Sequence, residues 1–265
     1  MAGFTSLMGY SNAEPRVSAM ALPDAIAGVT AAAAVVTALY RRDLFGETGL
    51  IECALHEGAI AMLGEFFVAR QLEGEQPARM GNAHPVHAPQ GVYRCAADAR
   101  VGDDAWIAIA VTTHAQWCAL AAVLDLNDVP EWRTAPGRRA DARRLNERIE
   151  ARTRSSDRLQ LMRMLQSAGV PAGAVMTAPD WLADEHLEAR GFFVPLAATH
   201  IDTRLYPGLP LQIDGERGAG WFAAPRLGQH NALIARAWLG WSAHRLAAAQ
   251  RSGACVVRPP DQPPP

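Results

Sequence analysis

The chain has 265 residues, of which 49% are hydrophobic and 20% are charged, and its formal net charge is -2. This composition is typical of a globular protein with one large domain or two small ones, and it gives no reason to expect a nucleic acid or a membrane as partner. All 25 basic residues are Arg, which excludes a Lys-bound pyridoxal cofactor, Schiff-base chemistry and a Lys-dependent phosphate loop.

The cysteines and the N-terminus indicate a cytoplasmic protein. The four cysteines have neither metal-site spacing nor a C-x-x-C pair, so we expect reduced thiols; they are Cys53, Cys95, Cys118 and Cys255. No basic segment followed by an apolar stretch opens the chain, so we expect no signal peptide. The longest apolar run, residues 25–40, is shorter than the roughly 20 residues of a bilayer span and favours a buried helix.

This apolar run begins with a typical helix start. Pro23 is tolerated in a first helical turn, and the Asp24 carboxylate is favourable near the positive end of the helix dipole. The run is apolar nearly all round, which predicts packing on several sides, yet few segments precede it that could supply neighbours. From spacing alone, Asp24 is more often a helix cap than a functional group.

Helical and strand periodicities alternate along the rest of the chain. The pattern predicts strands at residues 50–55, 106–111 and 192–196. It predicts helices at 56–72, 116–124, 140–152, 157–168, 179–189, 229–239 and 242–252. Ten Arg in residues 133–163 alternate with acids at helical spacing, which indicates a solvated helix face rather than a nucleic-acid surface.

Six stretches of the sequence form a recognisable series: MAGFTSLMG (1–9) with PRV (15–17) and PDAIAG (23–28), GETGLIECALHE (46–57), GNAHP (81–85) with GVY (91–93), AGVPAGAV (168–175), HLEARGFF (186–193) and LGQHN (227–231). In this order they resemble the family III CoA-transferases, a CaiB/BaiF-like group that includes the formyl-CoA, carnitine-CoA and bile-acid-CoA transferases. In the second stretch, Thr48 and Gly49 replace the family's usual Gly and Gln.

The resemblance implies an α/β fold. It implies a partial Rossmann-like large domain, with its N-terminal strands missing, plus a smaller α+β domain, as in the family III CoA-transferase fold. The expected divisions are 1–75 (large domain with the catalytic Asp), 76–91 (linker), 92–200 (small domain), 201–224 (linker), 225–255 (helices returning to the large domain) and 256–265 (disordered tail). It also implies a homodimer, or a partner chain that supplies the missing N-terminal half.

The same resemblance implies that Asp24 is catalytic. In the family, an Asp at this position attacks an acyl-CoA thioester and forms an acyl-aspartyl anhydride. The CoA thiolate then forms an aspartyl-CoA thioester, and a carboxylic acid acceptor finally takes up the CoA. We therefore expect acyl-CoA and a carboxylic acid as substrates, with no cofactor and no metal. Gly28, one turn further along the helix, is expected to leave space for the substrate.

The loop that contains GNAHP supplies further candidates. Asn82, His84 and Gln90 are candidate substrate contacts, with a purely structural loop as the alternative. His84 and His87 stand three residues apart, but no third metal ligand lies near them in sequence.

Two other functions stay open at this point. One is an acyl-CoA racemase or epimerase of the same superfamily, in which the Asp acts as acid and base together with a His from the N-terminal portion. The other is a truncated, non-catalytic remnant or subunit.

Overall fold

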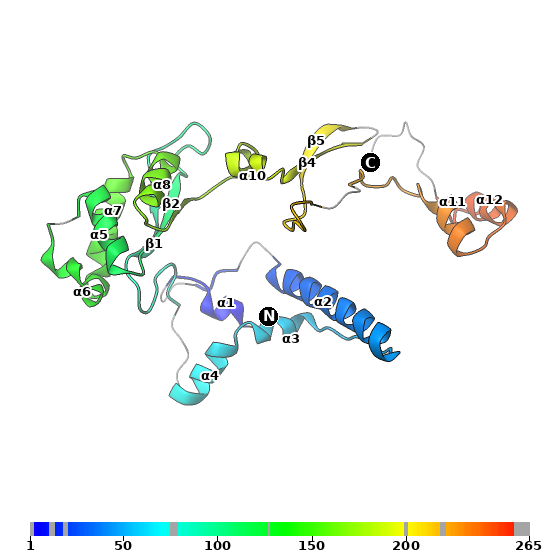
Figure 1. The fold of residues 1–265 in the computed structure, drawn as a ribbon, viewed down its shortest axis with the longest axis horizontal. Coiled ribbons are helices and arrows are strands. Elements are labelled where there is room, and N and C mark those ends of the chain that lie inside the picture. Colours follow the sequence, from blue (N-terminus) through cyan, green and yellow to red (C-terminus); the bar gives the residue numbers. More distant parts are fainter. Residues whose placement is uncertain are drawn as a thin grey trace. The chain divides into compact units, whose positions relative to one another are not determined.

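The computed structural model is shown in Figure 1. It describes residues 3–10, 14–17, 21–74, 79–126, 128–198, 201–217 and 221–256. Their contacts group into two compact units, Met1–Val175 and Met176–Pro265. The domain boundaries expected above lie elsewhere and stay a prediction. The expected tail lies outside the described residues, except for Val256.

The first unit contains a short helix, α1 (Phe4–Leu7), and a long one, α2 (Leu22–Phe45). Helix α2 has Pro23 in its first turn, as predicted. It ends at Gly46, which takes a left-handed conformation with φ of 69° and donates its N–H to the carbonyl of Arg42. A glycine in this conformation is a common helix stop, because it has no Cβ to clash with the backbone.

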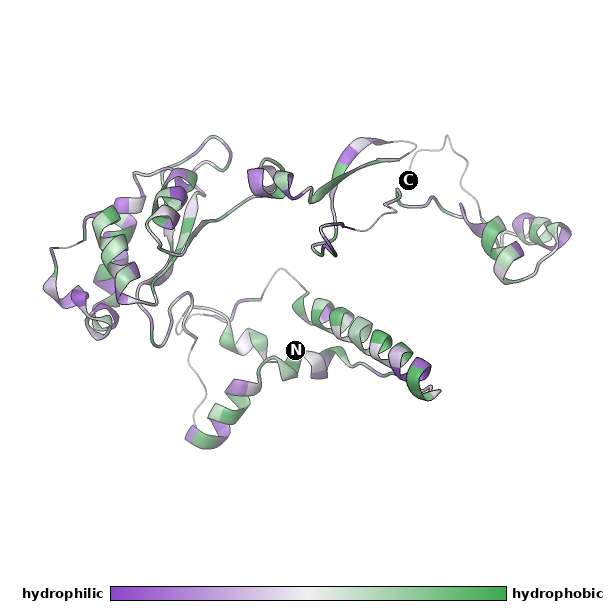
Figure 2. Cartoon of the chain, in the orientation of Figure 1, coloured by the Kyte–Doolittle hydropathy of each residue, from purple (hydrophilic) through white to green (hydrophobic). Residues whose placement is uncertain are grey.

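Helix α2 buries little of its apolar surface. Ala27 is its one buried residue among those described, and apolar colouring runs along much of the helix in Figure 2. The expectation of a helix packed on several sides is wrong for the described chain, because α3 (Leu55–Ala61) is its main neighbour and lies near its N-terminal half. At 24 residues, α2 is also longer than expected and could span a membrane by length and composition alone, a property that core helices of soluble proteins share.

The segment that follows α2 differs from the prediction in two ways. Residues 50–54 form no strand, because the described chain offers them no pairing partner. The helix predicted at 56–72 is divided into α3 and α4 (Gly64–Glu73). The break lies at Met62 and Leu63, whose N–H groups donate three residues back in a tight turn.

A three-stranded antiparallel sheet forms the centre of the first unit. Its strands are β1 (Gln90–Arg94), β2 (Trp106–Ala110) and β3 (Ala172–Ala174), in the order β1-β2-β3. Strand β2 confirms the prediction for residues 106–111. Strand β1 begins inside the segment expected to be a linker (76–91), where residues 90 and 91 pair with Ala110 and Ile109.

Helices cover one face of this sheet. Ile107 and Ile109 point into a core with Trp132 and Leu145, whereas the alternate residues of β2 lie on the other face. The surrounding helices are α5 (His114–Leu124), the 3₁₀-helix η1 (Pro130–Arg133), α6 (Ala135–Ala140), α7 (Ala142–Thr153) and α8 (Arg158–Ser167). The helices predicted at 116–124, 140–152 and 157–168 correspond to α5, α7 and α8.

The second unit contains a hairpin and short helices. Its elements are α9 (Ala178–Leu182), α10 (Glu185–Ala189), β4 (Phe193–Ala198), β5 (Ile201–Pro207), α11 (Asn231–Leu233), the π-helix η2 (Ile234–Trp238) and α12 (Ala243–Arg251). The helix predicted at 179–189 is divided because Asp184 caps α10 by accepting from the N–H of Leu187. The segment expected to be a linker at 201–224 begins with β5, which pairs with β4.

Candidate functional site

Asp24 lies in the first turn of α2 with its side chain exposed. Ala21 is the N-cap residue, and the N–H of Asp24 donates to the Ala21 carbonyl at 3.0 Å. No described residue forms a hydrogen bond or ion pair with the Asp24 carboxylate. The carboxylate is therefore not used as a helix cap within the described chain, and it remains accessible at the positive end of the helix dipole.

The helix surface beside Asp24 is open. Gly28 lies one turn further along α2 and is exposed. A Cβ placed on Gly28 would meet no atom within 4 Å. The described chain thus leaves this side of the helix uncovered beside Gly28.

The loop before β1 is anchored to the segment after α1. The N–H of Gly81 donates to the Gly9 carbonyl at 2.8 Å, and Asn82 Nδ2 donates to the Tyr10 hydroxyl at 3.3 Å. A side chain on Gly81 would lie 2.5 Å from the Tyr10 ring, and its φ of 58° also favours glycine. These contacts fix the position of Asn82.

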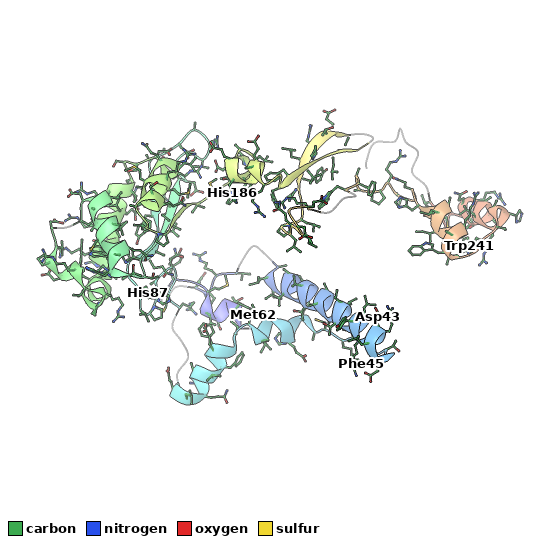
Figure 3. All side chains as sticks on the ribbon, viewed as in Figure 1. Asp43, Phe45, Met62, His87, His186 and Trp241 are labelled. Carbon is green, nitrogen blue, oxygen red and sulfur yellow. The ribbon has the colours of Figure 1, made fainter. Side chains whose placement is uncertain are left out.

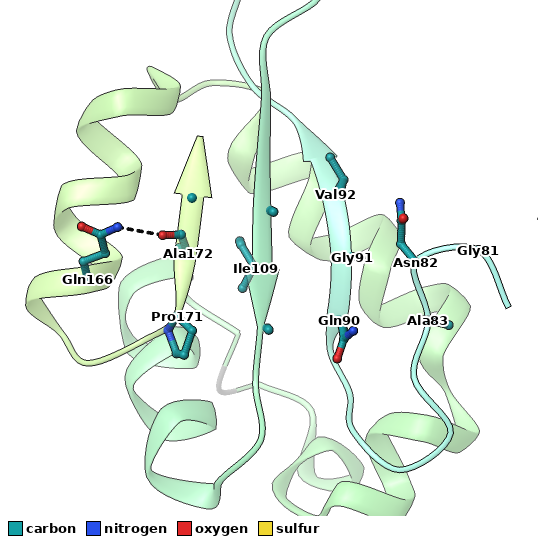
Figure 4. A pocket seen from close by; sticks show the side chains of 13 residues that line it. Gly81, Asn82, Ala83, Gln90, Gly91, Val92, Ile109, Gln166, Pro171 and Ala172 are labelled. Atoms are coloured by element: carbon teal, nitrogen blue, oxygen red, sulfur yellow. Dashed lines mark hydrogen bonds between the residues drawn. The ribbon is translucent and has the colours of Figure 1, made fainter. Parts of the chain in front are cut away.

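Asn82 and Gln90 line one open hollow on the sheet face that turns away from the core, with a volume of about 640 Å³. Figure 4 shows β2 between β1 and β3, with the loop that carries Asn82 beside β1. The residues of its floor that lie on this face are Gln90 and Val92 of β1, the small residues Ala108 and Ala110 of β2, and Gly173 of β3. On its β3 side, Gln166 Nε2 donates to the Ala172 carbonyl at 2.8 Å.

His84 lies in a different pocket, of about 310 Å³, which Gln90 also lines. The structure thus brings Gln90 together with Asn82 in one hollow and with His84 in the other. Asp24 lines neither of them. Sequence reasoning missed the small floor of the first hollow, although the alternation of Ile and Ala in β2 was a usable signal for it.

The His84 ring has a fixed orientation. Its Nδ1 accepts hydrogen bonds from the N–H groups of Val86 at 3.1 Å and His87 at 3.2 Å. The rings of His84 and His87 stack with centroids 4.6 Å apart, and Figure 3 labels His87 in this loop. The part of the chain that the structure describes holds no group of three or more residues suited to a metal ion.

Two arginines of α6 hold the same loop. Arg138 is buried, and its Nε donates to the Ala88 carbonyl at 2.6 Å while its Nη1 donates to the Trp132 carbonyl at 2.9 Å. Its guanidinium also lies 4.8 Å from the centre of the Trp117 ring. Burial lowers the pKa of Arg138 from its usual value. Arg139 Nη1 donates to the Val86 carbonyl at 3.1 Å.

The buried hydroxyl of Tyr93 holds Asn146, which lines the same pocket as His84. The Tyr93 hydroxyl donates to Asn146 Oδ1 at 2.8 Å. Burial, and secondarily the Glu150 carboxylate, raises the pKa of Tyr93 well above its ordinary value, so this phenol stays protonated as the donor.

Known proteins resemble this chain over most of its length. A model of CoA-transferase family III matches residues 1–231. A succinyl-CoA–D-citramalate CoA-transferase of Chloroflexus aurantiacus is 26% identical over 94% of this chain and 61% of its own length. The alpha subunit of a succinyl-CoA–L-malate CoA-transferase of the same organism is 27% identical over 92% of this chain and 56% of its own length.

A solved structure supports the fold. A CaiB/BaiF family protein from Brucella suis has a TM-score of 0.76 and 27% identity, over 90% of this chain and 60% of its own length. The mixed α/β fold expected from the sequence is therefore confirmed. The chain spans about three-fifths of the length of the relatives and structure that it matches.

Proposed function

Because this chain belongs to CoA-transferase family III, we propose that it moves CoA from an acyl-CoA thioester to a carboxylic acid, with Asp24 as the nucleophile. The relatives' names specify a succinyl-CoA donor and hydroxylated dicarboxylate acceptors, and we propose a small dicarboxylate as the acceptor here. We also propose a cytoplasmic location, which the free thiols of all four cysteines support.

The observation that carries this proposal is the accessible Asp24 carboxylate in the first turn of α2. A carboxylate is a weak nucleophile that needs to be ionised and held against its target. This carboxylate lies at the positive end of the dipole of α2. The positive end of the same helix dipole is suited to stabilise the oxyanion of a tetrahedral intermediate.

The proposed reaction proceeds through two intermediates on Asp24. An Asp24 oxygen attacks the thioester carbonyl. The C–S bond then breaks, CoA leaves as the thiolate, and an acyl-aspartyl anhydride remains. The thiolate then attacks the aspartyl carbonyl, which releases the donor acid and leaves an aspartyl-CoA thioester. The acceptor carboxylate reverses these two steps, so it receives the CoA and Asp24 returns as a free carboxylate.

We propose that the active assembly is a homodimer or includes a partner chain. The chain spans about three-fifths of its relatives' length, and one relative is named as an alpha subunit. Activity should therefore be assayed on the protein as it is purified from its native host, with any subunit that accompanies it.

The test is to incubate this protein with succinyl-CoA and then with hydroxylamine, which converts either intermediate into a hydroxamate on Asp24. Peptide mass spectrometry should find the hydroxamate on Asp24. It should be absent in Asp24→Asn and retained in Asp43→Asn, which alters an exposed carboxylate at the other end of α2 (Figure 3). Exchange of the α-hydrogen without a hydroxamate would instead indicate a racemase, and neither signal would indicate a non-catalytic chain.

A further inference from the structure

The pocket that contains His84 has a distinctive charge. We call it the histidine pocket; its polar lining side chains are His84, His87, Gln90, Arg139 and Asn146. Among the residues that the structure describes, no Asp or Glu lines it. The permanent charge in its lining is therefore that of the Arg139 guanidinium, which makes the pocket suited to an anion.

Two of these side chains have their acceptor atoms occupied, so that they offer donors. His84 Nδ1 accepts from two backbone N–H groups, which places the proton of the neutral ring on Nε2. Asn146 Oδ1 accepts from Tyr93, which leaves the Nδ2 hydrogens of Asn146 available. Arg139 donates one N–H to the Val86 carbonyl, and the other N–H groups of its planar guanidinium can still donate to a ligand.

The pocket is also rigid. The loop that carries both histidines is held through the Ala88 carbonyl by the buried Arg138, and through the Val86 carbonyl by Arg139. Asn146 is held by Tyr93. A ligand therefore meets donors that are already ordered, which reduces the entropy lost on binding.

We propose that the histidine pocket binds one carboxylate of the dicarboxylate acceptor, with Arg139 as the principal contact and His84, Asn146 and Gln90 as additional donors. This inference rests on the proposed function for the identity of the ligand. An arginine fork matches the two oxygens of a carboxylate. At about 310 Å³, the pocket is at the lower end of the range for small-molecule sites and suits a small acid rather than a whole CoA molecule.

The test measures binding without any acyl-CoA, so that it does not depend on Asp24. Succinate is titrated into the native protein while the imidazole C–H signals of His84 and His87 are followed by NMR, with His84→Gln and His87→Gln used for assignment. Inorganic phosphate and adenosine 3′,5′-bisphosphate are titrated separately, because a phosphate of CoA is another oxyanion source.

We expect succinate to shift both imidazole signals saturably. Arg139→Gln should weaken succinate binding by about tenfold or more, the effect of losing one charge-assisted contact. Arg143→Gln is the matched control, because Arg143 is an exposed neighbour that pairs with Glu147 and does not line the pocket; it should bind succinate normally.

The inference is overturned if succinate leaves both signals unchanged, if Arg143→Gln weakens binding as much as Arg139→Gln, or if only the phosphate compounds shift the signals. Succinate binding together with failure of the Asp24 hydroxamate test would reject the proposed reaction and retain the carboxylate site. A hydroxamate on Asp24 without succinate binding in the histidine pocket would retain the proposed reaction and reject the carboxylate site.

Discussion

Arg158 Nε lies 2.7 Å from Asp98 Oδ2, and this ion pair joins the first residue of α8 to the turn between β1 and β2. Arg158 is completely buried, and its Nη1 also donates to the Val175 carbonyl at the end of the first unit. The same Asp98 accepts from the N–H groups of Arg100 and Val101. One carboxylate therefore organises both the turn and the packing of α8.

Asp98→Asn should destabilise the first unit by about 1.5–3 kcal/mol at pH 7, because it removes a charge-assisted hydrogen bond from the buried Arg158. The hydrogen bond from Arg158 lowers the pKa of Asp98 below its usual value. A lowered folded-state pKa gives stability that is present above the unfolded pKa and is lost as the pH falls through the folded one.

Urea unfolding at a series of pH values tests this expectation, and the difference between native protein and Asp98→Asn should shrink in acid. Asp128→Asn is the control, because Asp128 forms an exposed pair with Arg148 and should change stability little. If the free energy of unfolding of Asp98→Asn differs from that of the native protein by the same amount at every pH, the role given to the Asp98 charge is wrong.

Asp24→Asn should abolish hydroxamate formation while changing the free energy of unfolding by no more than about 1 kcal/mol, the limit for an exposed charge in a first turn. Chemical denaturation of the variant beside native protein measures this. A large loss of stability would mean that the carboxylate has a structural role that its exposure does not reveal.

Gly91→Ala should destabilise the sheet by about 1–3 kcal/mol. The added Cβ would lie 2.8 Å from the Tyr93 hydroxyl, and Tyr93 cannot move freely because it is buried and bonded to Asn146. Gly173→Ala is the control in the same sheet; Gly173 pairs with Ala108 on the face away from the core, and its Cβ would meet nothing within 4 Å. Thermal unfolding of both variants compares them, and equal melting temperatures would refute the steric argument.

Arg138→Met should loosen the loop from residue 84 to residue 89. The change leaves the Ala88 and Trp132 carbonyls without the donor that now satisfies them, at a cost of about 1–3 kcal/mol for each buried group that stays unsatisfied. Hydrogen exchange should accelerate in this loop and in η1. If exchange increases only elsewhere, Arg138 does not hold the loop.

The cysteines should differ sharply in reactivity. Burial, and secondarily the Asp157 charge, raises the pKa of Cys95 to about 11, so at pH 8 it stays a thiol, which is unreactive. Cys118 is exposed and should be alkylated first by iodoacetamide. Peptide mapping after brief labelling checks this order, and early modification of Cys95 in folded protein would show that the region around β1 opens.

The sequence revealed the parts of the fold that local patterns specify. Pro23 and Asp24 marked the start of α2, and the apolar run at Trp106 predicted β2. The strand predicted at 50–55 failed because a strand requires a partner, which composition cannot show. The sequence did not reveal strand β1, because Gly91 and the prolines before it are residues that strands disfavour.

The candidate site was predicted only in part for a similar reason. Asn82, His84 and Gln90 were found because they are close together in a loop whose motif resembles a known family. Arg139 and Asn146 line the histidine pocket with His84 and Gln90, and they come from helices about 50 residues further along the chain. Only tertiary packing brings them near, so no local sequence pattern indicated them.

The single buried residue of α2 has a consequence for how the chain behaves in a cell. In the described chain this helix exposes a long apolar surface, and such surfaces attract chaperones and self-associate at high concentration. Recombinant yield should therefore depend on expression level and on what is co-expressed more strongly than on the intrinsic stability of the sheet and its helices.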